Sequence, residues 1–127
     1  NNGTTGWTQA NASSSISNSS GEFLVSVGVI TAGGYTQALS LTVGKQYLVT
    51  GNVRLVSGDY AHLAIINNAV SAFVYQGEQI TQVTNRTTSF VFTATETNNR
   101  IYMRIYYAAG GNRSGYFDNI SVREVLL

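Results

Sequence analysis

The chain of 127 residues contains no cysteine and no proline, and it has one lysine, Lys45, and one histidine, His62. Without cysteine there can be no disulfide bond, no thiolate metal site and no cysteine nucleophile. One histidine cannot build a histidine-rich metal centre, and no catalytic serine motif accompanies it. These absences argue against the common metal-dependent and nucleophilic enzymes.

Charge is also scarce. Charged residues make up 10% of the chain and the net charge is +1, so no basic stripe is available to neutralise a nucleic-acid backbone. The six acidic residues form no pattern that places two carboxylates in one cleft, as a glycosidase requires. The longest apolar run, "FLVSVGVI", has the length of a strand, far below the roughly 18 residues of a membrane-spanning helix. We therefore expect no catalysis, no nucleic-acid partner and no membrane insertion.

The residues that are present favour a β-protein. Hydrophobic residues make up 43% of the chain, and the polar remainder is dominated by Asn, Ser, Thr, Gln and Gly. Short stretches of alternating polarity are separated by turn residues, and no stretch keeps a helical spacing for three turns. The sequence predicts one all-β domain over residues 1–127, an antiparallel β-sandwich of the jelly-roll type with about nine strands. A surface this poor in charge is typical of an extracellular or virion domain.

The strand signals also define an expected core. Strands are expected over residues 22–30, 35–41, 46–56, 60–66, 70–75, 79–83, 88–94, 100–107 and 116–125, with short ones around Trp7 and over 11–17. Trp7 itself is expected to fill the core. The side chains expected in the core are those of Tyr47, Val49, Val53, Phe90, Phe92, Ile101, Met103, Ile105, Ile120 and Val122.

Four segments resemble a known family: "GTTGWT" at residues 3–8, "GGYTQALSLTVGKQYLVTGNV" at 33–53, "TSFVFTATETNNRIYMRIYY" at 88–107 and "GYFDNISVREV" at 115–125. The chain is similar to the galactose-binding-like, jelly-roll carbohydrate-binding modules, in particular those in tail, fibre and spike proteins of tailed bacteriophages. The resemblance implies a single jelly-roll domain, frequently trimeric on virions. Such modules include both sugar binders and purely structural modules.

The last strand contains a carboxylate at an unexpected position. If residues 115–125 are extended, Asp118 shares a face with Ile120 and Val122, which are expected to point into the core. A buried carboxylate needs a partner, and backbone N–H groups or a hydroxyl could supply one. The resemblance offers another partner, because many family members hold a structural calcium with the aspartate of this strand. Asp118 matches that aspartate, and Glu22 is the early acidic residue that would assist it.

The stretch "RIYMRIYY" suggests a ligand-binding surface. Tyr102, Arg104 and Tyr106 alternate with the core residues of this strand and therefore share its other face. Aromatic rings stack on sugar C–H surfaces, and arginine reaches hydroxyl or carboxylate oxygens. Nearby strands offer further outward candidates, namely Asn52, Arg54, Tyr60 and His62. The alternative is an ordinary sheet surface or a subunit interface, since tyrosines are common in strands.

These observations leave three functions open. The first is a non-catalytic virion module that recognises a glycan of the bacterial cell surface during attachment. The second is a ligand-free structural module of the particle that contacts other virion subunits and forms a homo-oligomer, such as a trimer. The third is an accessory carbohydrate-binding module of a secreted polysaccharide-degrading enzyme. The expected location is thus the virion, with secretion as the alternative.

Overall fold

The computed structural model describes residues 6–10, 14–19, 21–28 and 31–126. In these residues the chain is all-β and forms two antiparallel sheets of five strands each. The predicted β-sandwich is therefore confirmed, and no helix in these ranges could cross a membrane. The strands are β1 (Thr8–Gln9), β2 (Ser14–Ser19), β3 (Glu22–Val27), β4 (Ala32–Ala38), β5 (Gln46–Ser57), β6 (Tyr60–Ile66), β7 (Phe73–Gln76), β8 (Arg86–Thr93), β9 (Arg100–Tyr106) and β10 (Arg113–Glu124).

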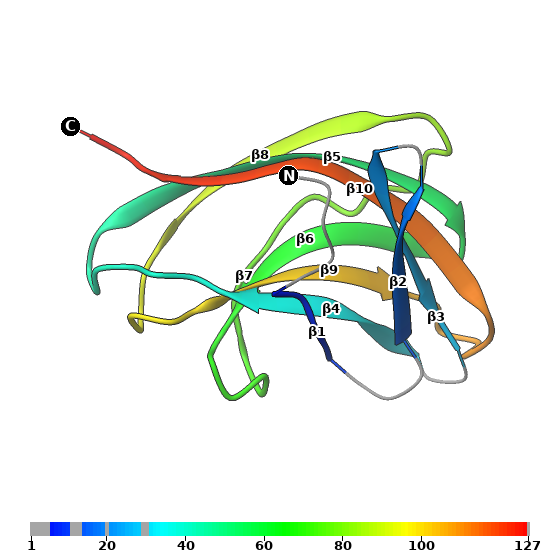
Figure 1. Cartoon of the computed structure of the whole chain (residues 1–127), viewed down its shortest axis with the longest axis horizontal. Helices are drawn as coiled ribbons and strands as arrows, with labels where there is room; N and C mark the ends of the chain where they lie inside the picture. Colours follow the sequence, from blue (N-terminus) through cyan, green and yellow to red (C-terminus); the bar gives the residue numbers. More distant parts are fainter. Residues whose placement is uncertain (1–5, 11–13, 20, 29–30, 127) are drawn as a thin grey trace.

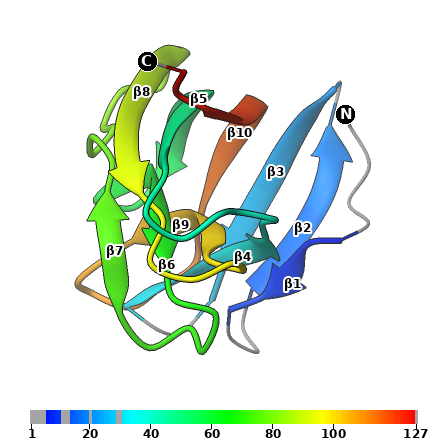
Figure 2. The same ribbon diagram turned by 90° about the vertical axis from the view of Figure 1, so that its left-hand side faces the viewer.

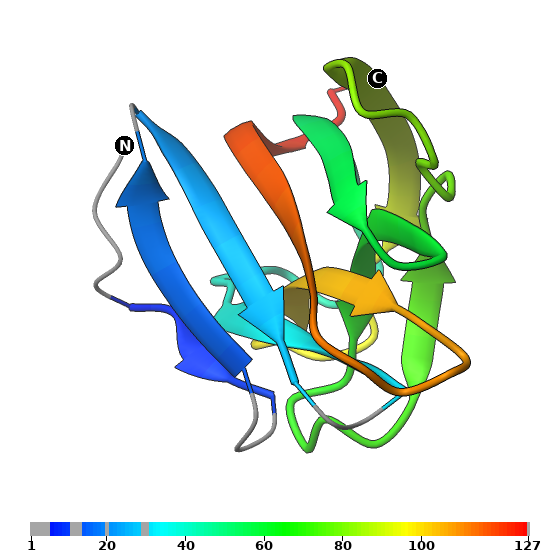
Figure 3. The ribbon, with the colours of Figure 1, turned by 90° about the vertical axis from the view of Figure 1, so that its right-hand side faces the viewer.

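The two sheets stack face to face. Sheet A has the strand order β1-β4-β9-β6-β7, and sheet B has the order β2-β3-β10-β5-β8 (Figure 1). Seen along the layers, β7 and β8 lie side by side at one edge of the sandwich, and β1 and β2 lie side by side at the other (Figures 2 and 3). At the first edge the rings of Tyr75 and Phe90 stack with their centroids 4.6 Å apart. Consecutive strands β5 and β6 lie in different sheets, as in a jelly roll.

The core lies between the sheets and follows the period of two. Along β5, Tyr47, Val49, Val53 and Leu55 are buried, while the residues between Val49 and Leu55 that point outward are half-buried. Of the ten predicted core residues, eight are buried. The other two, Ile120 and Val122, are half-buried and pack against the same cluster. The predicted core is confirmed, and Phe117 and Leu63, both fully buried, are among the further residues that belong to it.

Strand β4 begins at Ala32, before the expected start at residue 35. The "TAGG" segment lies between two expected strands and was therefore expected to form a turn, which is wrong for Gly33 and Gly34, because both pair with β9. A Cβ on Gly34 would lie 1.8 Å from the carbonyl oxygen of Met103, and its φ is +147°. The glycine is therefore needed for the close approach of two backbones inside a sheet.

The strand expected over 79–83 is absent from the described structure. Instead, Ile80 forms an isolated antiparallel bridge with Ala61, exchanging backbone hydrogen bonds of 2.8 and 3.0 Å. The side chain of Ile80 is nevertheless fully buried. The segment thus covers the core as a loop that is held by this bridge and by the Leu55 N–H, which donates to the Gln82 carbonyl oxygen at 2.8 Å.

Asp118 does not share the inward face of its strand with Ile120 and Val122, so that prediction is wrong. Up to Phe117, the odd-numbered residues of β10 point into the core, so Asp118 points outward and is half-buried. Between Asp118 and Ser121 the pairing with β5 shifts by one residue, and Asn119 has a φ of +52°. This β-bulge reverses the alternation, so that Ile120 and Val122 face the core although Asp118 does not. Asp118 Oδ1 accepts a hydrogen bond from the Asn119 N–H at 2.9 Å.

Candidate functional site

The outer face of sheet A brings five of the predicted ligand-binding residues together. Strands β6 and β9 pair directly, and the register sets Tyr60 opposite Tyr106 and His62 opposite Arg104. Tyr102 follows on the same face, opposite Ala64. The pairing is strongly specified, because a shift of one residue would move Ile101, Met103 and Ile105 out of the core.

Arg104 is at the centre of this group. Its Nη1 lies 3.0 Å from Nε2 of His62 and donates to the Tyr60 hydroxyl at 3.5 Å. The guanidinium carbon is 5.1 Å from the centroid of the Phe73 ring and 5.6 Å from that of the Tyr106 ring. Both distances fall in the range of a cation–π contact. The guanidinium is therefore held between aromatic rings, and its polar neighbours are uncharged.

His62 is fully buried and orients the guanidinium of Arg104. Its Nδ1 lies 3.3 Å from the carbonyl oxygen of Gly77. Because a carbonyl only accepts, Nδ1 carries the proton and the Nε2 lone pair is left to accept from Arg104. Burial, and next the charge of Arg104, lower the pKa of His62 to about 4. The imidazole is therefore neutral at physiological pH and fixed in one tautomer.

Two tyrosines form the half-buried end of the group. The rings of Tyr60 and Tyr106 stack with centroids 5.1 Å apart and an interplanar angle of 20°. Tyr60 also meets the edge of the His62 ring at 5.2 Å. Cross-strand aromatic pairs of this kind stabilise a sheet. They also leave a fixed apolar ring surface beside Arg104.

A cleft of about 260 Å³ lies on this face, beside the hairpin that joins β6 to β7. The Asn67 side chain holds the hairpin loop, because its Oδ1 accepts from the backbone N–H groups of Ser71 and Ala72 at 2.8 and 3.0 Å. Phe73, which is 42% exposed, forms one wall of the cleft. The lining residues are Ala10, Ile66, Val70, Ser71, Ala72, Phe73, Tyr102 and Arg104.

Tyr102 differs from the expectation of an outward, solvent-facing side chain. It lies on the outer face of sheet A, but it is only 7% exposed and packs with Ala64, Ile66 and Ala10. Burial raises the pKa of its phenol, and the nearby Arg104 opposes that shift. Tyr102 therefore forms the floor of the cleft and contributes to folding as well.

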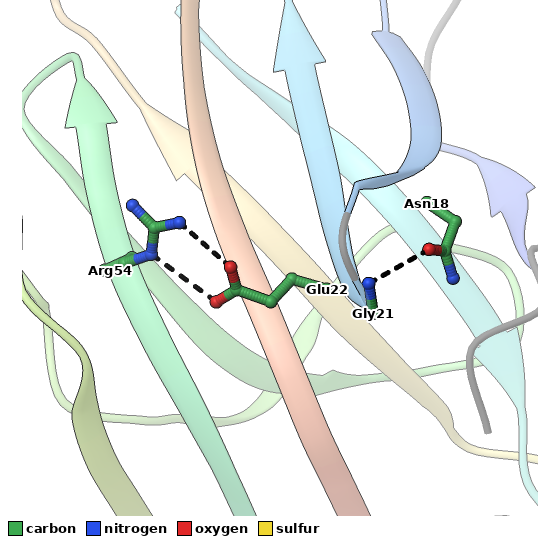
Figure 4. A network of polar contacts seen from close by, with 4 residues as sticks. All are labelled: Asn18, Gly21, Glu22 and Arg54. Atoms are coloured by element: carbon green, nitrogen blue, oxygen red, sulfur yellow. Dashed lines mark hydrogen bonds and ion pairs between the residues drawn. The ribbon is translucent and has the colours of Figure 1, made fainter.

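Arg54 is not part of this group, because β5 belongs to sheet B. On the outer face of that sheet its guanidinium reaches across β10 to the carboxylate of Glu22 on β3, with Nη2–Oε1 at 2.9 Å (Figure 4). It also covers the Tyr116 ring at 3.8 Å, and the hydrogen bond to Glu22 raises its pKa. Arg54 does point outward, but the expectation that it belongs to the same ligand surface as Tyr60 and His62 is wrong, since the chain changes sheets between β5 and β6. Asn52, also on this face, accepts from Thr87 Oγ1 at 3.1 Å.

The same ion pair bears on the predicted calcium ligands. Both carboxylate oxygens of Glu22 accept from Arg54, so a cation bound by Glu22 would have to displace a guanidinium. Among the residues that the structure describes, no three His, Asp or Glu side chains gather to hold a metal. Glu22 and Asp118 in this arrangement therefore do not fit a shared calcium site. Calcium stays an untested prediction.

Phe73 is the site residue that was not found by reasoning from the sequence. Its strand was expected over residues 70–75, and the three residues "NNA" that separate it from the strand expected over 60–66 indicate a short hairpin. The pairing of Ile66 with Phe73 and a bulge next to it place the ring on the outer face beside Arg104. The turn predicts that the two strands are neighbours. The bulge that sets the direction of the Phe73 side chain has no clear sequence signal.

A second hollow, of about 250 Å³, lies beside Trp7. Trp7 is half-buried, meets Phe23 edge-on at 5.7 Å and packs against the core, as expected. Gln37 and Asn119 supply the two amide side chains of the lining, which is otherwise apolar. This hollow has no charged group, unlike the cleft beside Arg104.

No protein-family model matches the chain, and no relative was found among curated proteins. Several solved structures are similar. The N-terminal cellulose-binding domain of β-1,4-glucanase C from Cellulomonas fimi has a TM-score of 0.72 at 16% identity, covering 99% of this chain and 93% of that one. The first family-22 xylan-binding module of a Paenibacillus barcinonensis protein has a TM-score of 0.71 at 15% identity, covering 98% and 88%. The enzymatically active domain of tailspike protein 4 from bacteriophage CBA120 has a TM-score of 0.65 at 12% identity, covering 98% and 20%.

At these identities the similarity establishes the fold. Two of these structures are named as carbohydrate-binding domains and span almost the same length as this chain. The third is part of a much longer tailspike chain. A shared fold does not by itself carry a shared ligand, which must be argued from the residues on the surface.

Proposed function

We propose that this chain is a non-catalytic glycan-binding module whose ligand lies over the outer face of sheet A. The observation that carries the proposal is the position of Arg104 between Phe73 and Tyr106, next to a cleft on the outer face of a sheet. The carbohydrate-binding neighbours with the same fold support it.

The arrangement suits a sugar for physical reasons. A sugar ring has apolar C–H faces and a polar rim, so it needs an aromatic surface and directed hydrogen-bond donors. Exposed Phe73 and half-buried Tyr106 supply ring surface, and the guanidinium of Arg104 supplies donors. His62 and Tyr60 hold the guanidinium in place before any ligand arrives, which lowers the cost of ordering it on binding.

The finer proposal is attachment of a virion to a bacterial surface. The resemblance to tail, fibre and spike modules of tailed phages and the similarity to a tailspike domain support this location. On the resemblance alone, the proposed partners are other virion subunits and the proposed assembly is a homotrimer. An accessory module of a secreted polysaccharide-degrading enzyme is the alternative. The family-22 and cellulose-binding neighbours support that alternative equally well.

A structural module without a ligand is the second candidate. Several apolar side chains are exposed on the described surface, among them Leu126 at 85%, Val83 at 68% and Val43 at 56%. Contact with neighbouring subunits would remove them from water. If this candidate is right, light scattering will show an oligomer, and no glycan will bind.

The proposal is tested by applying the purified chain to an array of bacterial surface polysaccharides. We expect binding by the wild type and loss of the signal with Tyr106→Ala. The control is Arg123→Gln, which changes an exposed residue of β10 in sheet B. Binding that survives Tyr106→Ala would place the ligand elsewhere, for instance in the hollow beside Trp7. The absence of any bound glycan would favour the structural candidate.

A further inference from the structure

Resting on the proposed function, we infer that the glycan carries a carboxylate, as in a uronic acid, and that Arg104 is its partner. The inference rests on how charges are distributed over the two sheets. On the outer face of sheet B, the charge of Arg54 is balanced by the carboxylate of Glu22. On the outer face of sheet A, Arg104 forms no such ion pair among the described residues.

The ion pairs of the described residues all lie away from the cleft. Lys45 pairs with Glu124 at 3.0 Å and Arg54 with Glu22 at 2.9 Å. Arg86 pairs with Glu78 at 3.1 Å. In the described part of the chain, no carboxylate lies within ion-pair distance of Arg104. Its charge is therefore not balanced by the protein.

The groups that fix Arg104 are uncharged. His62 is held neutral by burial, so it accepts a hydrogen bond without adding a charge. Tyr60 contributes a hydroxyl and Phe73 a ring face. A guanidinium has five N–H donors, more than the contacts made by Nη1 to these neighbours can use. The protein has oriented a cation without neutralising it.

A second arginine lies on the same face of β9. Arg100 donates from Nε to Asn68 Oδ1 at 3.1 Å and from Nη1 to Thr36 Oγ1 at 3.3 Å, which are again neutral acceptors. Two acids border this face, and both accept backbone N–H groups: Glu96 from Asn68 at 3.0 Å and Asp59, which precedes Tyr60, from Ala108 at 2.9 Å. Among the ion pairs of the described residues, neither acid is paired with Arg104.

A carboxylate on the ligand is the group that best complements the guanidinium of Arg104. Arginine and a carboxylate form two parallel, charge-assisted hydrogen bonds, and these are about twice as strong as neutral ones. The half-buried, aromatic surroundings screen the pair less than open solvent does. A neutral sugar would cover the guanidinium with hydroxyl groups and leave its charge without a counter-ion. An acidic sugar ring can stack on Phe73 or Tyr106 while its carboxylate reaches Arg104.

The test uses uronic-acid-containing bacterial polysaccharides in two forms: native, and carboxyl-reduced so that each –COO⁻ becomes –CH₂OH. We expect the wild type to bind native forms at least about tenfold more tightly than their reduced partners, with binding that weakens as NaCl is raised. Arg104→Gln should abolish this preference. Arg104→Lys should keep only part of it, because a lysine cannot bind in a bidentate manner, and Arg123→Gln should leave it unchanged.

The outcomes separate the inference from the proposed function. Equal binding of native and reduced forms would overturn the carboxylate and leave glycan binding standing. A preference for sulfated glycans over uronic acids would also overturn it in favour of another anion. A folded wild-type chain that binds neither these polysaccharides nor any glycan of the array would overturn both. Because the comparison of native and reduced forms uses the wild type, it remains decisive if an Arg104 variant fails to fold.

Discussion

Arg104 and His62 form a directed pair on adjacent strands, with Nη1 of the arginine 3.0 Å from Nε2 of a neutral, fully buried imidazole. The other nitrogen of the ring lies 3.3 Å from the Gly77 carbonyl oxygen. His62 has no exposed surface and therefore serves as a positioning residue: it fixes the donor that faces the cleft. The predicted ligand-binding role of His62 is thus an indirect one in our proposal.

Replacing the imidazole tests this role. His62→Phe keeps an aromatic ring in the core but leaves the Gly77 carbonyl and Arg104 Nη1 without their partner. We expect a loss of about 1–3 kcal/mol in the free energy of unfolding, measured with urea. The preference for native over carboxyl-reduced glycan should fall as well, and a purely structural role would not change that preference. In a double-mutant cycle with Arg104→Gln, the two changes should be non-additive. Additive effects would mean that the pair does not act as a unit.

The pKa of His62 predicts how stability depends on pH. The pKa of His62 is about 4 in the folded chain, against an ordinary value of 6.5, so between these pH values the unfolded chain binds more protons. The contribution of His62 is fully present above pH 6.5 and is lost as pH falls toward 4, by at most about 3 kcal/mol. The groups that face the ring are Arg104, Tyr60 and the Gly77 carbonyl. Thermal melts across this range should show a steeper decline for the wild type than for His62→Phe.

Gly34 should tolerate no side chain. A Cβ there would lie 1.8 Å from the backbone oxygen of Met103, and neither paired strand can move away without breaking the sheet. We expect Gly34→Ala to cost more than about 4 kcal/mol in unfolding free energy or to prevent folding. Gly44→Ala is the matched control, because Gly44 also has a positive φ, +89°, but has open space around it. It should cost only about 1 kcal/mol from backbone strain. If the two variants lose the same free energy of unfolding, backbone strain alone, and not the contact with Met103, accounts for the loss.

Calcium can be tested on the intact chain. Because Arg54 engages both oxygens of Glu22, we expect EDTA to leave the melting temperature unchanged. Asp118→Ala should change the free energy of unfolding by no more than about 1 kcal/mol, since Asp118 is half-buried and bonds a neighbouring N–H. A drop in melting temperature with EDTA that Asp118→Ala removes would instead support the predicted metal site.

The sequence was sufficient for the alternating strands and most of the core, because burial of one face imposes a period of two. It was not sufficient where a single residue breaks that period. The bulge at Asn119 turned Asp118 outward, and the close approach at Gly34 put an apparent turn inside a strand. Arg54 was assigned to the wrong face because sequence alone does not say where the chain passes from one sheet to the other. Tyr102, Arg104 and Tyr106 were found because one strand carries all three.

The most direct test of the central claim compares two tyrosines that are alike in setting but lie on opposite sheets. Tyr106 in sheet A and Tyr116 in sheet B are both half-buried, point outward and lie under an arginine. With a glycan that the array identifies, isothermal titration should show that Tyr106→Ala weakens binding by about tenfold or more, whereas Tyr116→Ala leaves the Kd unchanged. A loss of affinity with Tyr116→Ala and none with Tyr106→Ala would contradict the account and move the ligand to sheet B.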